Sequence, residues 1–146
     1  MAEIGPITLL MLQHHAVVNK FLSAFEKISE KDTQKMKNSF KIFKWNLEKH
    51  FFIEETNFFT VANKDNKTEL SQLNNLLKDH KDLMAIMDNL NEDLDRGKKP
   101  VTEILKELLF AHERRETDSF YPMLDKRLSE KEKKEIIKKT GDITLG

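Results

Sequence analysis

Apolar residues recur at intervals of three and four positions through most of the chain, which is the spacing of one face of an α-helix. Three short runs interrupt this pattern, at 29–32, 62–67 and 97–100, and each is rich in residues that cap or break helices. The pattern therefore predicts four long helices, over about residues 7–28, 33–61, 67–96 and 100–127. Pro100 suits the first turn of the fourth helix, where its missing N–H would have no partner in any case.

A fifth, shorter helix is predicted after these four. Ser129 and Glu132 have the spacing of a capping box, and Gly141 marks the helix end. Long helices joined by short connections lie antiparallel to their sequence neighbours. We therefore expect an all-α fold, an up-down-up-down antiparallel four-helix bundle with a short C-terminal fifth helix. It should form a single domain over residues 1–146, with its core between residues 7 and 128.

Composition narrows the possible chemistry. The 25 Lys and Arg balance the 25 Asp and Glu and are interleaved with them, so we expect no nucleic-acid partner. The chain has no Cys, which excludes disulfides, thiolate zinc sites and iron–sulfur clusters. Any metal site must therefore be built from histidines and carboxylates.

We expect no membrane-targeting segment at the start of this sequence, and we expect the lysine-rich run near its end to be exposed to solvent, with membrane-surface or partner binding there as the alternative. Residues 1–6 contain no basic segment, and the apolar stretch that follows is interrupted by polar residues, unlike a signal peptide or a membrane span. The lysine-rich run KEKKEIIKK at 131–139 alternates with glutamate and is typical of a solvated helix face. We expect a cytoplasmic protein with no membrane partner.

Four of the five histidines are predicted to lie at one level of the bundle. With turn centres at residues 31, 64 and 98, His15 and His50 lie 16 and 19 residues from the first centre. His50 and His80 lie 14 and 16 residues from the second, and His80 and His112 lie 18 and 14 from the third. These offsets agree within about one helical turn of 5.4 Å. Each histidine follows a leucine by three positions, so all four are expected to point into the core.

Two of these histidines have a carboxylate one turn later. Glu54 follows His50 by four residues and Glu116 follows His112 by four, a spacing at which both side chains can bind one metal or two adjacent metals. The segments HFFIEETNFF and HERRETDSFY, which begin at these histidines, also match in the aromatic pair that follows. Burying four histidines and two carboxylates in a dry core without partners would cost much free energy, which favours a metal site. A metal-free bundle acting as an interaction module is the alternative.

These segments resemble the haemerythrin-like family, also called the HHE cation-binding domain, a four-helix bundle that holds two non-haem irons. The resemblance covers Ile7 to Leu128, and its carriers are HHAVVNKFLSAF, HFFIEETNFF, LLKDHKDL and AHERRETDSFYP. His15 is favoured over His14 because family members read His-x2-aliphatic-x3-Leu, which fits Val18 and Leu22. The resemblance implies two irons with an oxo or hydroxo bridge, and these metal ligands: His15, His50, Glu54, His80, His112 and Glu116.

The chain also departs from the oxygen-carrying haemerythrins, which use five histidines and end in Asp at i+5. Here His80 has no second histidine four residues away, and the last carboxylate is Glu116 at i+4. The resemblance then leaves two iron coordination positions open where the carriers leave one, which disfavours reversible oxygen carriage. The Glu-x2-His motif of ferritin-like proteins is absent, because leucine precedes each of the four histidines by three.

The resemblance thus implies a non-haem di-iron protein that binds, senses or reacts with dioxygen, nitric oxide, peroxide or iron. A di-iron peroxide or nitric oxide reductase is the alternative from the enzyme class. Nitrogen and oxygen ligands also permit zinc or manganese substitution. Tyr121 is expected near the edge of the site, packed with Phe120. Trp45 and the phenylalanines at 51, 52, 58 and 59 are expected to lie mostly in the core.

Overall fold

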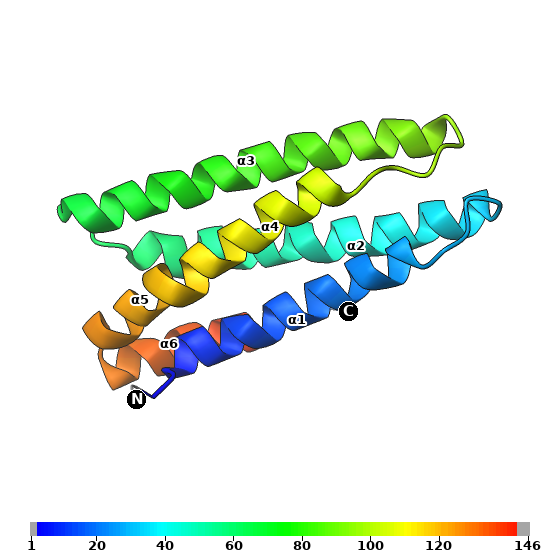
Figure 1. The fold of residues 1–146 in the computed structure, drawn as a ribbon. Coiled ribbons are helices and arrows are strands. Elements are labelled where there is room, and N and C mark those ends of the chain that lie inside the picture. Colours follow the sequence, from blue (N-terminus) through cyan, green and yellow to red (C-terminus); the bar gives the residue numbers. More distant parts are fainter. Residues whose placement is uncertain (1–2, 143–146) are drawn as a thin grey trace.

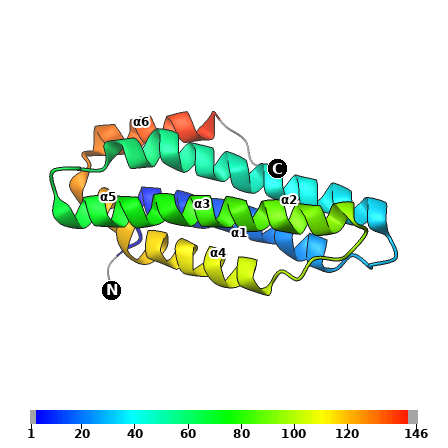
Figure 2. The ribbon, with the colours of Figure 1, turned by 90° about the horizontal axis from the view of Figure 1, so that it is seen from above.

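The computed structural model describes residues 3–142, and this part of the chain contains helices and no strands, as the sequence predicts. Figure 1 shows α1, α2, α3 and the α4–α5 segment side by side, with the chain reversing at each end. Figure 2 shows α6 along one end of α2. The α-helices are α1 (Pro6–Glu26), α2 (Thr33–Ile53), α3 (Lys67–Asp95), α4 (Glu103–Arg115), α5 (Tyr121–Arg127) and α6 (Glu130–Gly141).

Three short helices of other types complete the chain. Two π-helical turns, η1 (Glu54–Phe58) and η3 (Glu116–Phe120), follow α2 and α4, and a 3-10 turn, η2 (Phe59–Val61), ends the second segment. The predicted helices 33–61 and 100–127 are therefore not continuous α-helices. Each is interrupted at the glutamate that the sequence singles out as a ligand.

Local capping explains where most helices begin and end. Asp32 accepts a hydrogen bond from the backbone of Lys35 at the start of α2, and Ser129 forms the predicted capping box at the start of α6. Gly97 follows the end of α3 with a φ of +73°, a conformation that glycine adopts without strain. Its N–H bonds the carbonyl of Leu94, which gives the tight helix end that the sequence predicts.

The start of the fourth helix differs from the prediction. It begins at Glu103, so Pro100 lies in the preceding link and not in the first turn. Lys99 donates from Nζ to the carbonyl oxygens of Glu26 and Ile28, at 2.9 and 2.7 Å, and so satisfies acceptors at the end of α1. Holding this link against α1 delays the helix by one turn.

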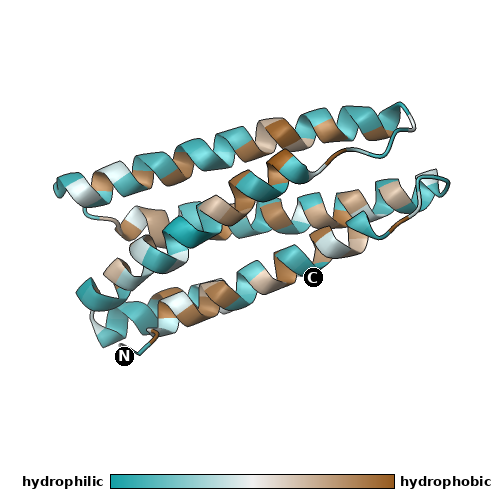
Figure 3. Ribbon diagram, in the orientation of Figure 1, coloured by the Kyte–Doolittle hydropathy of each residue, from teal (hydrophilic) through white to brown (hydrophobic). Residues whose placement is uncertain are grey.

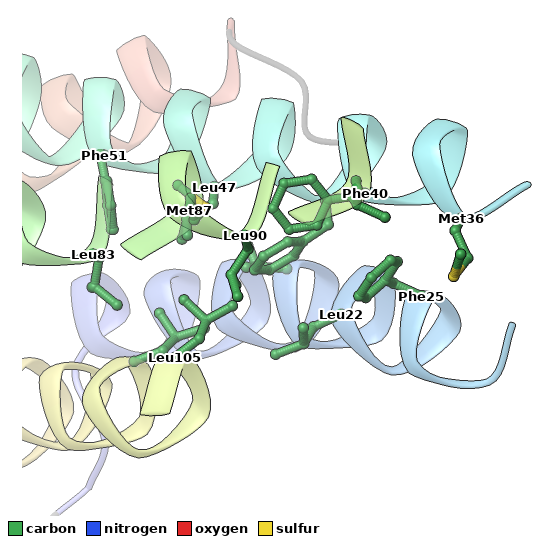
Figure 4. Close-up of a cluster of buried hydrophobic side chains, with 14 residues drawn as sticks. Leu22, Phe25, Met36, Phe40, Leu47, Phe51, Leu83, Met87, Leu90 and Leu105 are labelled. Carbon is green, nitrogen blue, oxygen red and sulfur yellow. The ribbon is translucent and has the colours of Figure 1, made fainter. Parts of the chain in front are cut away.

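Two apolar clusters fill the interior. One, shown in Figure 4, gathers phenylalanines, leucines and methionines toward the α1–α2 turn, including Phe25, Phe40 and Leu90. The other lies toward α5 and α6 and includes Phe58 and Tyr121. Figure 3 shows that each long helix carries both hydrophobic and hydrophilic positions along its length.

Two aromatic side chains lie outside this core, contrary to the prediction. Trp45 is 59% exposed and Phe52 is 58% exposed, whereas Phe51, Phe58 and Phe59 are buried. Trp45 and Phe52 are seven residues apart, two helical turns, so they share the outer face of α2. Within residues 3–142, none of the helices combines the length and the apolar character needed to cross a membrane.

Candidate metal centre

A layer of polar side chains separates the two apolar clusters. Along each long segment, one histidine lies between a residue of one cluster and a residue of the other. All four are at most 5% exposed, and the two glutamates one turn after His50 and His112 are fully buried. The predicted common level and inward orientation of the histidines are therefore confirmed.

The predicted leucine neighbours are only partly correct. Leu47 and Leu109 are buried beside His50 and His112, but Leu12 is 39% exposed. On α1 and α3 the buried neighbour is instead the residue four positions earlier, Met11 or Leu76. Positions three and four earlier share a helix face, and the rotation of each helix decides which one faces inward.

The polar layer forms two groups of four side chains that share both glutamates. In each group, one ligand atom from each residue lies within 4.8 Å of those of the others. Two histidines and two carboxylates within this distance form a donor set suited to a divalent metal ion. The first group is His15, His50, Glu54 and Glu116, and the second is His80, His112, Glu54 and Glu116.

Each glutamate contacts a histidine from each group. Glu116 Oε1 lies 3.1 Å from His15 Nε2 and 3.4 Å from His112 Nε2. Glu116 therefore connects the two groups of ligand atoms.

Glu54 makes the equivalent contacts on the other side of the site. Its Oε1 atom lies 3.3 Å from His50 Nε2 and 3.1 Å from His80 Nε2, with His112 Nε2 at 3.7 Å. All six predicted ligands thus point their nitrogen or oxygen atoms at one small volume.

The π-helical turns determine what lies beside the glutamates. The backbone N–H of Tyr121 donates to the carbonyl of Glu116, and that of Phe59 donates to the carbonyl of Glu54, both five residues earlier. Pro122 lacks the N–H that an α-helix would pair with Asp118, which favours a break there. Single π-turns inside α-helices occur frequently at functional sites.

Tyr121 lies deeper in the site than predicted. Its ring packs against Phe120, as expected, with the centroids 5.6 Å apart. Its hydroxyl, however, donates to Glu54 Oε2 and lies 3.0 Å from Glu116 Oε2, and the residue is fully buried. Burial raises the pKa of Tyr121 well above its ordinary value, and the charge of Glu54 adds to this shift. Tyr121 therefore keeps its proton, which it donates to Glu54, while its hydroxyl oxygen lies beside Glu116.

Carboxylates outside the predicted set contact the second ring nitrogen of three histidines. Asp79 Oδ2 lies 2.9 Å from His112 Nδ1 and 2.5 Å from Arg115 Nη2. Glu55 Oε2 lies 3.2 Å from His80 Nδ1. Such partners fix the orientation of metal-binding imidazoles and raise their basicity.

The third outer carboxylate is Glu113. Its Oε2 atom lies 3.9 Å from His15 Nδ1, and Asn19 donates to its Oε1 atom at 3.0 Å. Burial raises the pKa of Glu113. Sequence analysis missed all three outer carboxylates, although Asp79, Glu55 and Glu113 are each adjacent to a predicted ligand.

Several buried nitrogens have no hydrogen-bond partner within the described structure. His50 Nδ1 and Nε2 and His112 Nε2 are in this group. Such atoms destabilise a fold unless something binds them. The two inward Nε2 atoms face the shared glutamates, so bound metal ions would satisfy them and compensate the buried negative charge. The donor set and these unpartnered atoms fit a pair of metal ions.

Protonation of the metal-free site is strongly perturbed. Burial lowers the pKa of His50 to about 3. Burial also opposes the charged form of His112, but the hydrogen bond with Asp79 and the negative charge of Glu54 outweigh it and raise the pKa to about 9. In Glu54, burial opposes ionisation, but the surrounding imidazoles hold the pKa well below its ordinary range.

His14, the alternative to His15, lies apart from both groups of ligand atoms. It is half-buried, and its ring centroid lies 5.8 Å from that of His50. Burial, together with the charge of neighbouring His15, lowers its pKa. The structure therefore brings His15, and not His14, to the shared glutamates.

Comparison with known proteins agrees with this geometry. The family model of the Hemerythrin HHE cation binding domain matches residues 5–124, which contain all six of these side chains. Among the curated proteins and the solved structures compared with the chain, none matches it. Since the family match covers most of the 146 residues, the chain belongs to the hemerythrin HHE cation-binding domain family.

Proposed function

We propose that this protein is a non-haem di-iron protein built on an up-down-up-down four-helix bundle. The observation that carries the proposal is the pair of four-residue groups that share Glu54 and Glu116. Two histidines per metal and two bridging carboxylates leave coordination positions open for a small ligand. Dioxygen, nitric oxide, peroxide or iron itself is then bound, sensed or consumed at the site. A cytoplasmic location is part of the same proposal.

Iron, when bound, supplies redox chemistry toward these small molecules. The chain's own residues hold the metals, orient the imidazoles and exclude water. Phe51 stacks on His80 with ring centroids 3.8 Å apart, and Phe59 covers the same imidazole at 5.3 Å. Asp79 and Glu55 hold the outer nitrogens of His112 and His80. Two phenylalanine rings therefore cover the His80 side of the site.

A second candidate is a peroxide or nitric oxide reductase, and Tyr121 is the observation that favours it. A reductase needs a proton donor beside the reacting ligand. The Tyr121 hydroxyl is a buried O–H group in contact with both shared glutamates. Because burial raises its pKa, it can give its proton only to a strongly basic group. Turnover of peroxide or nitric oxide with a supplied reductant, lost in Tyr121→Phe, would favour the reductase over a sensor.

Metal analysis tests the primary proposal. Protein from iron-supplied cells should contain two irons per chain, one for each ligand group, and show charge-transfer absorption after exposure to oxygen. Glu54→Ala combined with Glu116→Ala should abolish iron binding, since each group then loses half of its ligands. Glu107→Ala combined with Glu135→Ala removes two exposed carboxylates and should retain the iron.

The alternative, a metal-free interaction module, predicts the opposite results for metal content and stability. If it were correct, the native protein would carry no metal, and the Glu54 and Glu116 double variant would be more stable to urea because it no longer buries two carboxylates. Zinc or manganese at full occupancy, with no iron, would retain the site but assign it a different metal.

A further inference from the structure

The outer face of α2 carries apolar side chains that the described structure leaves uncovered. Ile42, Trp45 and Phe52 are 48%, 59% and 58% exposed, and they lie on the same side of the helix as Lys49. Figure 2 shows α6 beside only one end of α2. Exposed apolar groups of this kind mark interaction surfaces in soluble proteins. We call Ile42, Trp45, Lys49 and Phe52 the α2 seam.

The spacing of the α2 seam is that of a coiled coil. Its positions are separated by three, four and three residues, the alternation of positions a and d in a heptad. The inner face of α2 does not share this role, because Phe43, Leu47 and His50 are buried in the bundle. α2 therefore has one face for the domain interior and a second face with the pattern of a helix partner.

The α2 seam also contains a surface hollow of the kind that receives a side chain in a coiled coil. Its volume is about 400 Å³, and it is lined by Trp45, Glu48, Lys49 and Phe52. These residues occupy positions i, i+3, i+4 and i+7, the four positions that form a hole for one side chain of a facing helix. The hollow can therefore receive one side chain of a facing helix, as in knobs-into-holes packing.

We infer that the α2 seam pairs antiparallel with the α2 seam of a second copy of this chain. In an antiparallel pair, position a of one helix faces position d of the other. Ile42 then faces Phe52 of the second copy, and Lys49 faces Trp45 of the second copy. The knob that enters the hollow is the indole of the second copy.

Charge decides the direction of pairing. A parallel pair would place Lys49 against Lys49 of the second copy, two cations at the centre of an apolar seam. An antiparallel pair instead places each Lys49 on an indole, a contact that Lys49 already makes with Trp45 of its own chain at 5.6 Å.

The charged residues that flank the seam agree with the same register. Lys41 and Glu55 lie at its two ends on one flank, so antiparallel pairing brings each Lys41 next to Glu55 of the second copy. Glu48 meets its own counterpart at the centre of this flank. Its charge is already compensated by Lys44, whose Nζ lies 3.4 Å away. The seam is therefore complementary to itself, as a two-fold interface must be.

Oligomeric state tests the inference directly. Sedimentation velocity of the full chain, over about 1 to 500 μM to span affinities expected of a small interface, should show a shift from 17.2 kDa toward twice that mass. Trp45 is the only tryptophan, so its fluorescence should shift to the blue over the same range as the indole leaves water. A 17.2 kDa species at every concentration would overturn the inference.

Matched variants locate the interface. Trp45→Ser combined with Phe52→Ser should raise the dimer dissociation constant by at least about tenfold, since a central tryptophan dominates small interfaces. Ile104→Ser removes an apolar side chain that is 70% exposed on α4 and should leave the dimer unchanged. An equal effect of both changes would place the contact elsewhere and overturn the inference.

A charge exchange tests the antiparallel register. Lys41→Glu alone and Glu55→Lys alone should each weaken self-association, because each places like charges together at both ends. An equimolar mixture should restore a mixed dimer, in which every flanking pair is again opposite in sign. Since Glu55 also contacts His80, the Lys41→Glu result stands by itself if the Glu55 variant misfolds. Dimerisation that is indifferent to Lys41→Glu would overturn the register.

Discussion

The hydroxyl of Tyr121 lies 3.0 Å from Glu116 Oε2, a carboxylate five residues earlier in the same segment. In a regular α-helix, residues five apart point about 140° away from each other. The π-turn between them reduces this offset to about 40°, because it adds one residue, about 100°, to the turn. In this turn Tyr121 pairs its backbone N–H with the carbonyl of Glu116. The same device on the second segment places Phe59 over His80, five residues after Glu54. A local change of helix type thus brings an aromatic side chain to each side of the site.

Tyr121→Phe should destabilise the metal-free protein by about 1–3 kcal/mol, because it leaves the buried oxygen Oε2 of Glu54 without its donor. The ring packing with Phe58 and Phe120 is retained, so the fold and the iron content should be unchanged. Urea unfolding of the metal-free protein measures the effect.

Thr60→Val is the control for Tyr121→Phe. It removes a hydroxyl that bonds only the backbone of Thr56 on an exposed turn, and it should change stability much less. Equal stabilities of Tyr121→Phe and the native protein would contradict the hydrogen bonding described here.

Asp79→Asn should lower iron affinity by about 10–100-fold, because outer carboxylates hold metal-binding histidines in place. The amide removes the charge that His112 and Arg115 share while it keeps the size of the side chain. Competition with a chelator measures the affinity. Asp82→Asn removes a carboxylate from the same helix that pairs with Lys78 at the surface, and it should have no effect. The prediction is wrong if the two variants bind iron equally well.

The metal-free protein should be most stable near pH 6.5. Burial lowers the pKa of His50 from 6.5 to about 3, so the unfolded chain binds more protons between these values and stability falls with acid. The pKa of His112 rises from 6.5 to about 9, because burial is outweighed by the hydrogen bond with Asp79 and the negative charge of Glu54. The native state therefore binds more protons between these values, and stability falls as pH rises toward 9.

Unfolding by urea across the range from acid to alkaline pH measures this profile. Asp79→Asn should flatten the alkaline limb, because Asp79 bonds His112 Nδ1 and its negative charge helps to raise the pKa of His112. The acid limb, to which the lowered pKa values of His50 and Glu54 both contribute, should survive. A native profile that rises steadily through pH 9 would refute the assignment.

Phe40→Ala should destabilise the fold by about 3–5 kcal/mol, through lost burial and the cavity it leaves. Phe40 is fully buried and packs edge-to-face on Phe25 at 5.4 Å (Figure 4). The cluster lies to one side of the metal centre, so chains that remain folded should keep their metal. Val101→Ala, at a side chain that is 73% exposed, should be nearly neutral. Loss of metal from folded Phe40→Ala protein would show that the cluster and the site are coupled.

The sequence by itself determined the helical class, most of the turns and the six side chains that meet at the site. Apolar spacing is a local property, and caps such as Asp32 and the Ser129 box act within one turn. The level of each histidine follows from helix length and turn position alone, so His15, His50 and His112 could be placed without a structure. Family resemblance then separated His15 from His14.

Tertiary structure alone decided what surrounds those six residues. Asp79, Glu55 and Glu113 reach a histidine on another helix, and such contacts depend on how each helix is rotated in the bundle. The π-turns also escaped sequence analysis, since one extra residue in a turn hardly changes hydrophobic spacing but rotates every later side chain by about 100°. That rotation carried Tyr121 from the expected edge of the site onto both shared glutamates.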